Sequence, residues 1–146
     1  MTEYRAEENL GYLVNRAARL LSQRLARRIA PQGVSVAQWA VLLFLYQTDD
    51  RNQVELSRYV AVEPPTMVRT IDRMVRDGLV ERRPDPKDAR AVRITLTEKA
   101  RGLRDPLMAA SRATNAEVLA VFEKGEGERL LSDLRMLVGH LVADAD

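Results

Sequence analysis

The fold of this chain is decided by residues 52–97, which read NQVELSRYVAVEPPTMVRTIDRMVRDGLVERRPDPKDARAVRITLT. Two short helical patterns, at residues 54–60 and 64–77, are separated by a tight turn. Two strands are predicted next, at residues 80–83 and 91–96, and the proline-rich segment between them predicts a hairpin tip. Helix, turn, helix and charged hairpin in this order predict a winged helix-turn-helix, a fold that reads duplex DNA.

Two helices are predicted upstream of this segment. Apolar residues recur at three- and four-residue steps between Leu10 and Ile29, which indicates one long amphipathic helix. Ser35 and Gln38 then have the spacing of a capping box, and a second helix continues from there to about Thr48.

Two further helices are predicted after the hairpin. Thr97 is placed to cap a fifth helix that runs to about Phe122, and Pro106 within this helix predicts a bend. The loop at residues 125–127 precedes a last amphipathic helix, whose apolar residues extend to Val142. The predicted fold is therefore mainly α, with the element order α-α-α-α-β-β-α-α.

Composition limits the classes of protein that fit. The 146 residues are one domain's worth of chain. There is no cysteine, and His140 is the only histidine, so disulfides, thiolate metal sites and metal-binding histidine pairs are excluded. The sequence contains no glycine-rich phosphate loop and no nucleophile elbow. We therefore expect no cofactor, no metal and no enzymatic activity.

The N-terminus and the hydropathy pattern predict where the chain resides. Residues 1–9 are acidic and polar rather than basic and then apolar, which is unlike a signal peptide. No apolar run approaches the roughly 18 residues that a membrane span requires. We therefore expect a soluble cytoplasmic protein without a membrane partner.

The net charge of +2 conceals an uneven distribution of charge. Residues 51–104 hold 13 basic and 8 acidic side chains, whereas residues 105–146 hold 4 basic and 8 acidic ones. The middle of the chain is therefore the part that favours anions, and a dimer would set two such basic faces side by side. The alternative is an ordinary solvated surface of charged residues.

The second helix of the helix-turn-helix carries the residues predicted to read bases. At about 100° per residue, one sector of this helix contains the apolar residues Met67, Val68, Ile71, Met74 and Val75. The opposite face consists of Pro65, Thr66, Arg69, Arg73 and Arg76. An arginine can pair with both acceptors of a guanine in the major groove, and we expect Arg69 to be the principal contact. The alternative is a solvated face whose arginines serve solubility.

Two carboxylates interrupt this arginine face. Glu63 stands at the N-cap position before Pro64, and Asp72 lies between the arginines, where either carboxylate would repel a phosphate. We expect Asp72 to pair with Arg69 or Arg76 along the helix and to hold that guanidinium ready for binding.

The hairpin tip is predicted to supply a second contact. Arg90 projects from the start of the return strand, and an arginine that enters a narrow minor groove gains from its negative potential. Asp88 lies two residues earlier, where it can accept a hydrogen bond from Arg90 and hold it extended. The alternative is a surface salt bridge of under about 1 kcal/mol. Further phosphate contacts are predicted at Ser57, Arg58, Lys87 and Arg93.

The hairpin spells Asp88, one residue, Arg90, five residues and Leu96-Thr97, and in this it resembles the MarR family of bacterial transcriptional regulators. The resemblance extends from about residue 9 to residue 142. It implies that Asp88 orients Arg90 and that Arg90 enters the minor groove. Ala89 departs from the pattern, because many members carry a second basic residue at this place.

The apolar stripes of the first, fifth and sixth helices flank the compact middle segment, which leaves too little of one subunit to cover them. We expect them to bury each other across a two-fold axis, and the resemblance implies the same obligate homodimer. The chain, 1–146, is then one domain, in which 35–97 form the DNA-binding part and 9–31 and 98–143 form the dimerisation helices. The alternative is a three-helix packing within one chain.

The resemblance also implies a small aromatic or lipophilic anion as an effector, bound between the dimerisation helices and the DNA-binding part. The matching positions in this chain are Tyr12, Arg16, Trp39, Leu43 and Met108. An aromatic ring beside a cation suits an aromatic carboxylate or its thioester. The alternative is that Tyr12 and Trp39 are ordinary core residues.

These features predict a homodimeric regulator that binds a pseudo-palindromic operator in double-stranded DNA and represses or activates transcription. Repression by blocking polymerase access, until an effector releases the dimer, is the favoured mode. The main alternative is a winged-helix scaffold that binds protein instead of DNA, and it leaves the arginine face unexplained. A further alternative is the dimerisation module of a larger enzyme, such as a methyltransferase, but the sequence contains no cofactor domain.

Overall fold

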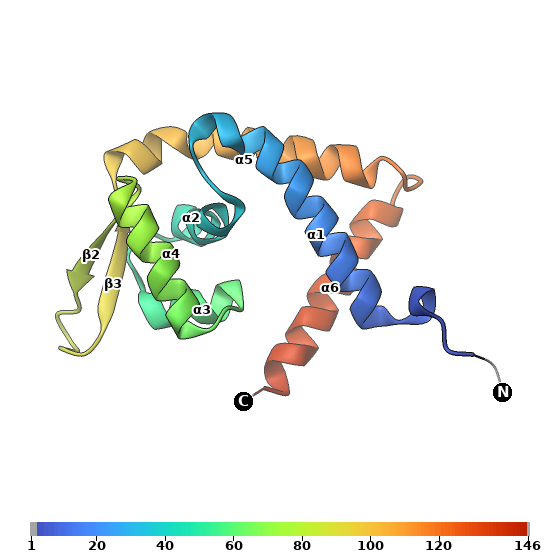
Figure 1. The fold of residues 1–146 in the computed structure, drawn as a ribbon, viewed down its shortest axis with the longest axis horizontal. Coiled ribbons are helices and arrows are strands. Elements are labelled where there is room, and N and C mark those ends of the chain that lie inside the picture. The colour runs from blue at the N-terminus through green and yellow to red at the C-terminus, as the bar shows by residue number, and fades with distance from the viewer. Residues whose placement is uncertain (1–2, 146) are drawn as a thin grey trace. The chain divides into compact units, whose positions relative to one another are not determined.

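The structure, a computed structural model, describes residues 3–145 and is mainly helical (Figure 1). The helices are α1 (Leu10–Ile29), α2 (Val36–Gln47), α3 (Gln53–Val60), α4 (Pro64–Arg76), α5 (Glu98–Leu119) and α6 (Glu126–Ala143). The strands are β1 (Arg51–Asn52), β2 (Val80–Pro84) and β3 (Val92–Leu96). The predicted fold class is confirmed, with β1 as an additional strand. The chain divides into two compact units between Ser111 and Arg112.

The hairpin of β2 and β3 is the wing of the winged helix-turn-helix, and it belongs to a three-stranded antiparallel sheet with the strand order β1-β3-β2. Val80 pairs with Leu96 and Pro84 pairs with Val92, so the two predicted strands form one hairpin (Figure 1). The sequence pattern does not predict β1, because two residues are too few to show alternation. Arg51 of this strand pairs with Ile94 and thereby ties the start of α3 to the hairpin.

Local interactions set the boundaries of the helices around the turn. The predicted capping box is confirmed, because the Ser35 N–H donates to Gln38 Oε1 at 3.0 Å and the Gln38 N–H donates to Ser35 Oγ at 3.2 Å. Asn52 Oδ1 accepts from the N–H of Val54 at 2.8 Å and caps α3. Ala61 then adopts a left-handed conformation with φ 58°, which makes the turn from α3 to α4 tight.

The core of the first unit attaches α4 to the helices behind it. The residues with at most 1% exposure include Met67, Ile71 and Met74 of α4 and Leu42 and Leu45 of α2. Each such side chain contributes about 1.5–3 kcal/mol when it leaves water. The sequence places Val68 and Val75 in the same buried sector, but they stay 40% and 41% exposed. The buried face of α4 is therefore narrower than predicted.

Two side-chain hydrogen bonds from α2 fix the neighbouring helices. Gln38 is 5% exposed, and its Nε2 donates to Asp77 Oδ2, at the end of α4, at 2.8 Å. This hydrogen bond is the main cause of the lowered pKa of Asp77, and Arg76 adds to it. The Tyr46 hydroxyl donates to the carbonyl of Ala100 in α5 at 2.6 Å, and burial raises the pKa of Tyr46 to about 12.

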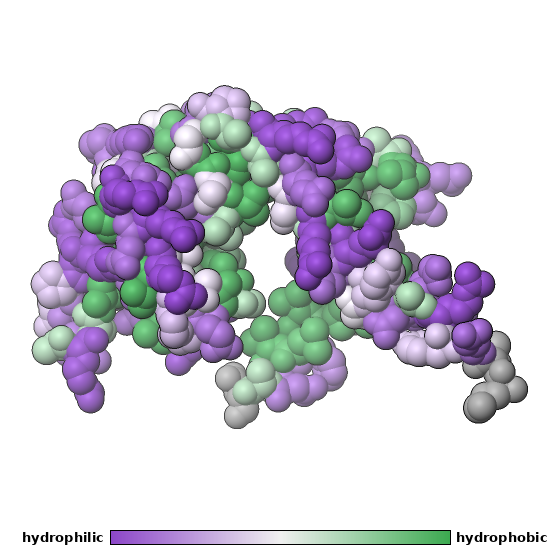
Figure 2. All heavy atoms as spheres, viewed as in Figure 1, coloured by the Kyte–Doolittle hydropathy of each residue, from purple (hydrophilic) through white to green (hydrophobic). Residues whose placement is uncertain are grey.

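The second unit contains the end of α5 and the whole of α6. Many apolar side chains of α6 are exposed, and Figure 2 shows hydrophobic residues on the visible face of this helix. His140 lies near the end of α6 and its Nε2 is 3.2 Å from Asp144 Oδ2. α5 runs as one helix through Pro106, and a bend at this proline stays a prediction.

Within residues 3–145, no single helix is long and apolar enough to cross a membrane. Only the pair of segments Leu10–Gln32 and Val36–Gln47, taken together across a bend of 77°, has the length and composition of a membrane span.

Candidate nucleic-acid interface

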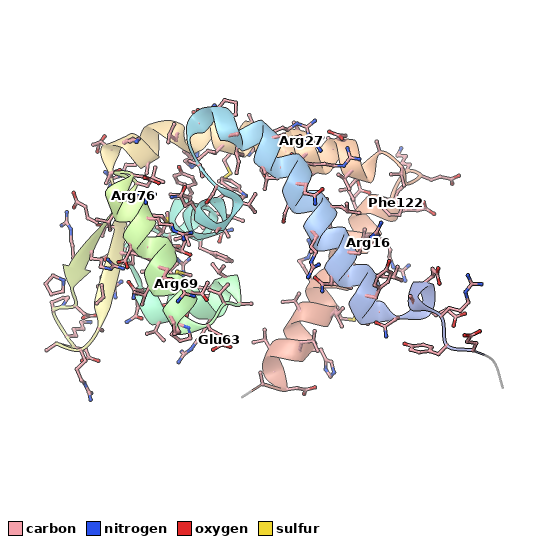
Figure 3. The ribbon with its side chains drawn as sticks, viewed as in Figure 1. Arg16, Arg27, Glu63, Arg69, Arg76 and Phe122 are labelled. Carbon is pink, nitrogen blue, oxygen red and sulfur yellow. The ribbon has the colours of Figure 1, made fainter. Side chains whose placement is uncertain are left out.

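The side of α4 that faces solvent carries the residues predicted to read bases. Exposed or half-exposed on this helix are Pro65, Thr66, Arg69, Arg73 and Arg76. Arg69 Nη2 donates to Thr66 Oγ1 at 3.2 Å, which supports the arginine along the helix. Arg69 and Arg76 follow Glu63 along α4 (Figure 3), and hydrophilic residues cover this helix in the space-filling view (Figure 2). The structure thus brings the predicted base-reading residues together on one element and leaves their charged groups accessible.

Asp72 has a different partner from the one expected. Its Oδ1 lies 2.6 Å from Nη1 of Arg82 in β2, while Arg76 Nε pairs with Asp77 at 3.1 Å. The prediction that Asp72 holds Arg69 or Arg76 is therefore wrong. The hairpin folds back beside α4 and brings a strand residue to the carboxylate, which spacing within a helix cannot reveal. Arg82 thus lies against the predicted base-reading helix, a position that no pattern in the sequence indicates.

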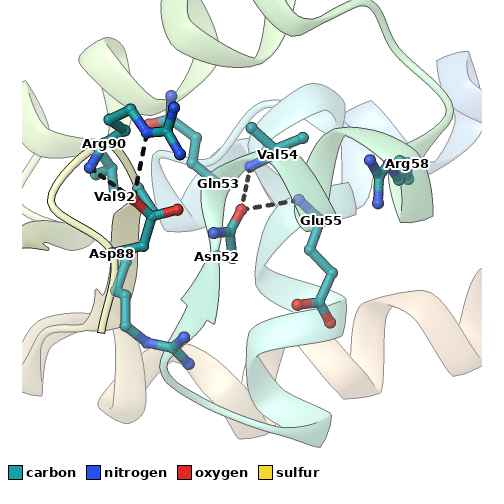
Figure 4. Close-up of a pocket in the computed structure, with 10 residues that line it drawn as sticks. Asn52, Gln53, Val54, Glu55, Arg58, Asp88, Arg90 and Val92 are labelled. Atoms are coloured by element: carbon teal, nitrogen blue, oxygen red, sulfur yellow. Dashed lines mark hydrogen bonds and ion pairs between the residues drawn. The ribbon is translucent and has the colours of Figure 1, made fainter. Parts of the chain in front are cut away.

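Arg90 lies at the wing tip with its side chain 94% exposed. Asp88 Oδ1 accepts from the backbone N–H of Arg90 at 3.0 Å and lies 3.7 Å from its Nε (Figure 4). Asp88 therefore shapes the turn that presents Arg90 and also pairs with its guanidinium. An exposed pair of this length contributes little to folding, and the guanidinium remains accessible to a ligand.

Arg93 braces the base of the wing tip. Its Nε donates to Asp50 Oδ1 at 2.8 Å and its Nη1 donates to Asp85 Oδ2 at 3.4 Å. The hydrogen bond that Arg93 donates to the Asp50 side chain is the main cause of the raised pKa of Arg93. The pKa of Asp85 is lowered, chiefly by the backbone N–H of Lys87, and Arg93 lowers it further. Two carboxylates of this chain therefore accept from Arg93, and its role as a phosphate contact stays a prediction.

Ser57 also differs from its predicted role. It is 3% exposed, and its Oγ donates to the carbonyl of Val54 at 2.5 Å. The prediction of Ser57 as a phosphate contact is wrong, because the hydroxyl is turned onto the backbone of its own helix. Arg58 and Lys87 are exposed, and both stay predicted phosphate contacts.

A groove of about 680 Å³ lies between the start of α3 and the hairpin (Figure 4). Its lining includes Arg58 from α3 and Arg90 from the hairpin, together with Gln53 and Glu55. The Glu55 carboxylate lies 3.3 Å from Arg51 Nη1, which offsets its charge. Arg93 and Asp88 of the hairpin also line the groove, and Asp88 pairs with Arg90. Three arginines from two elements therefore line one groove, an arrangement suited to the phosphates of a nucleic-acid backbone.

The structure does not bring the five predicted effector residues together. Tyr12 and Arg16 line a hollow of about 220 Å³ whose lining residues all belong to α1. Trp39 is 5% exposed and lies in the core, with its ring centroid 6.5 Å from that of Tyr46. Leu43 and Met108 are partly buried against the same core. Trp39 therefore has the environment of a core residue, as the alternative interpretation expects, whereas Tyr12 is 43% exposed and does not lie in the core.

An arginine-bearing helix beside a hairpin with an exposed arginine at its tip defines a winged helix-turn-helix protein of the DNA-binding class. The MarR-family model matches residues 32–91. The transcriptional regulator MOSR from M. tuberculosis, solved in complex with DNA, is 30% identical with a TM-score of 0.76, and the match covers 94% of this chain and 96% of that chain. This chain belongs to the MarR family of transcriptional regulators, and it is a regulator rather than an enzyme.

Two further solved structures support the same assignment. A MarR transcriptional regulator from Methanosarcina mazei Go1 matches with a TM-score of 0.85 and 25% identity, over 92% of this chain and 96% of that chain. A mutant MarR from E. coli, complexed with operator DNA, matches with a TM-score of 0.79 and 25% identity, over 88% of this chain and 92% of that chain.

Proposed function

We propose that this regulator binds a pseudo-palindromic operator as a homodimer, with α4 in the major groove and the hairpin tip in the adjacent minor groove. The observation that carries the proposal is the exposed arginine face of α4 together with Arg90, whose side chain is 94% exposed at the wing tip. Arg69 and Arg73 supply donors for base edges, and Thr66 suits a phosphate or a thymine methyl. Arg58 and Lys87 add charge for the backbone.

The homodimer is supported by apolar side chains that each unit leaves exposed. Exposures of 38–69% are found for Leu10, Leu13, Val14 and Leu21 on α1 and for Leu134, Met136, Leu141 and Val142 on α6. Apolar side chains exposed in this number along a helix are typical of an interface. Within a single domain of residues 1–146, we assign 9–31 and 98–143 to dimerisation and 35–97 to DNA binding.

We further propose that the bound dimer represses transcription by occluding the promoter and that a small aromatic or lipophilic anion releases it. The support is Tyr12 and Arg16, which place a ring and a cation beside one hollow. Such a ligand acts by favouring one spacing of the two DNA-binding parts, since half-sites about one helical turn apart tolerate little error. Operator DNA must then change the affinity for the ligand by the same factor as the ligand changes the affinity for the operator.

Footprinting of the DNA upstream of the protein's own gene tests the DNA contacts. Wild type should protect two half-sites about one helical turn apart, Arg69→Ala should lose protection, and Arg90→Ala should give weaker and less A·T-selective protection. Arg5→Ala is the matched control, because Arg5 is 70% exposed and pairs with Glu7 at 3.5 Å outside the winged helix. Indifference to both interface substitutions would place DNA on another surface.

Two measurements separate this proposal from a protein-binding winged-helix scaffold. A scaffold predicts that no upstream fragment is retarded at low salt, whereas a DNA-binding dimer with about six to ten phosphate contacts loses three to five decades of affinity between 50 and 200 mM salt. Sedimentation of the purified protein tests the homodimer directly, and a monomer at micromolar concentration contradicts it.

A further inference from the structure

Arg82 of β2 joins three elements of the winged helix through one guanidinium group. Its Nη1 lies 2.6 Å from Asp72 Oδ1, and its Nη2 donates to the Val68 carbonyl at 3.1 Å, so both contacts are with α4. Its Nε donates at 3.2 Å to Oε1 of Gln53, at the start of α3. Each nitrogen of the guanidinium therefore has its own acceptor, and the planar fork of arginine is what allows all three contacts.

Strand alternation explains why Arg82, and not its neighbour, reaches α4. Arg82 pairs across the hairpin with Ile94, which is fully buried, so the two side chains share the face of the hairpin that lies toward the helices. Arg83 lies on the opposite face, where its Nη2 pairs with Glu81 at 3.1 Å. β2 contacts α4, and strand alternation brings only the first of the two consecutive arginines onto that helix.

Asp72 makes this contact relevant to DNA. Its side chain is 58% exposed on α4, among arginines predicted to face DNA, where an unpaired carboxylate would repel phosphates. Arg82, on the hairpin, offsets the negative charge of Asp72. Asp72 therefore does not need Arg69 or Arg73 as an ion-pair partner. The base-reading arginines therefore keep their donors for the nucleic acid.

We propose that Arg82 is a positioning residue that fixes the wing to the base-reading helix and thereby determines operator specificity. The proposal rests on the proposed function, in which Arg69 and Arg90 enter neighbouring grooves at the same time. Because β2 carries the hairpin, fixing β2 to α4 fixes the distance between those two arginines. Binding constellations work only when they are held within about 0.5 Å of the productive geometry.

The test compares Arg82→Ala with Arg83→Ala, which removes the same charge from the next position without touching α4. Fluorescence anisotropy gives dissociation constants for the operator duplex and for a scrambled duplex of the same length and composition. For Arg82→Ala, we expect the preference for operator over scrambled duplex to fall by about tenfold or more, the discrimination of one well-placed base contact. For Arg83→Ala, both duplexes should weaken by the same factor, with the preference unchanged.

The variant Asp72→Ala distinguishes a positioning role of the Arg82–Asp72 pair from a purely electrostatic one. It removes a negative charge from the DNA-facing helix, so the scrambled duplex should bind more tightly. The operator preference should nevertheless fall, because β2 loses an anchor on α4. A purely electrostatic role for the pair predicts an unchanged preference in this variant.

Arg82→Lys keeps the charge but replaces the fork by one compact ammonium group, so it should retain affinity for scrambled DNA and lose operator preference. This variant and Asp72→Ala carry the test if thermal denaturation shows that Arg82→Ala does not fold. Unchanged preference in the Arg82 and Asp72 variants, or an equal loss of preference in Arg83→Ala, would overturn the proposal. Absence of any operator preference in wild type is a different result, because it contradicts the proposed function before a variant is compared.

Discussion

Replacement of Arg90 by alanine should weaken DNA binding without weakening the fold. The Arg90 side chain is 94% exposed, and its ion pair with Asp88 is long at 3.7 Å. Exposed pairs of this kind contribute at most about 1 kcal/mol. The thermal midpoint should therefore move by at most about 4 °C in a chain of this length.

The effect on affinity follows from the number of copies of Arg90 in the proposed homodimer. If each of the two copies releases one condensed counterion on entering the minor groove, their loss lowers the slope of log K against log salt by about 1.8, since each released counterion contributes about 0.9. Over the fourfold change from 50 to 200 mM salt, this difference in slope amounts to about one decade. The advantage of wild type over Arg90→Ala should therefore shrink about tenfold across that range.

Fluorescence anisotropy with the operator duplex at several salt concentrations measures this slope, and Arg5→Ala controls for the loss of one exposed, ion-paired arginine. An affinity that falls by one constant factor at every salt concentration would show that Arg90 does not act through the charge of the DNA. A large drop in the thermal midpoint would show that Arg90 supports the fold instead. Either result refutes the reasoning.

Three further predictions concern the scaffold that presents the site. Ser35→Ala removes half of the capping box and should lower the free energy of unfolding in urea by about 1 kcal/mol; no change would mean that the cap is not formed. Ala61→Gly should raise the thermal midpoint, since the left-handed φ of 58° costs alanine about 1–2 kcal/mol and glycine's extra entropy costs only about 0.5–1 kcal/mol; a lower midpoint would contradict this. The pKa of Asp77 is lowered in the folded state, chiefly by Gln38, so its stabilisation is present above the ordinary carboxyl pKa of about 3.9 and is lost as the pH falls through the lower folded-state value. The thermal midpoint should consequently fall less steeply below about pH 5 for Asp77→Asn than for wild type. Parallel curves of thermal midpoint against pH for the two proteins would rule this out.

The elements of the fold could be predicted because each has a local signature. Ser35 and Gln38 lie three residues apart and form the capping box that their spacing predicts. The apolar spacing of Met67, Ile71 and Met74 predicts which side of α4 is buried, and those residues are buried. Interactions between residues three or four positions apart depend on helical geometry alone, so they can be read from the chain before any tertiary contact is known.

The roles of the polar residues around the wing could not be predicted in the same way. Arg93 has the spacing of an outward-facing strand residue, yet Asp50, 43 positions away in the chain, accepts from its Nε. Asp72 has the spacing of a helical ion pair, yet Arg82 of the hairpin holds it. Ser57 has the polarity of a surface residue but is buried. A charged side chain reaches several candidate partners, and only the folded chain decides which of them lies within hydrogen-bonding distance.

The sequence by itself determined the order of helices and strands, the helix that carries arginines and the hairpin that carries Asp88 and Arg90, because these depend on periodicity and turn chemistry. Tertiary structure alone decided that Arg82 bridges β2 to α4, that β1 pairs with β3, and that Trp39 lies in the core apart from Tyr12 and Arg16. The physical reason is the distance along the chain over which each kind of interaction acts. Backbone geometry and hydrophobic spacing act over a few residues, whereas an ion pair or a strand ladder joins groups whose separation along the chain carries no information about their separation in space.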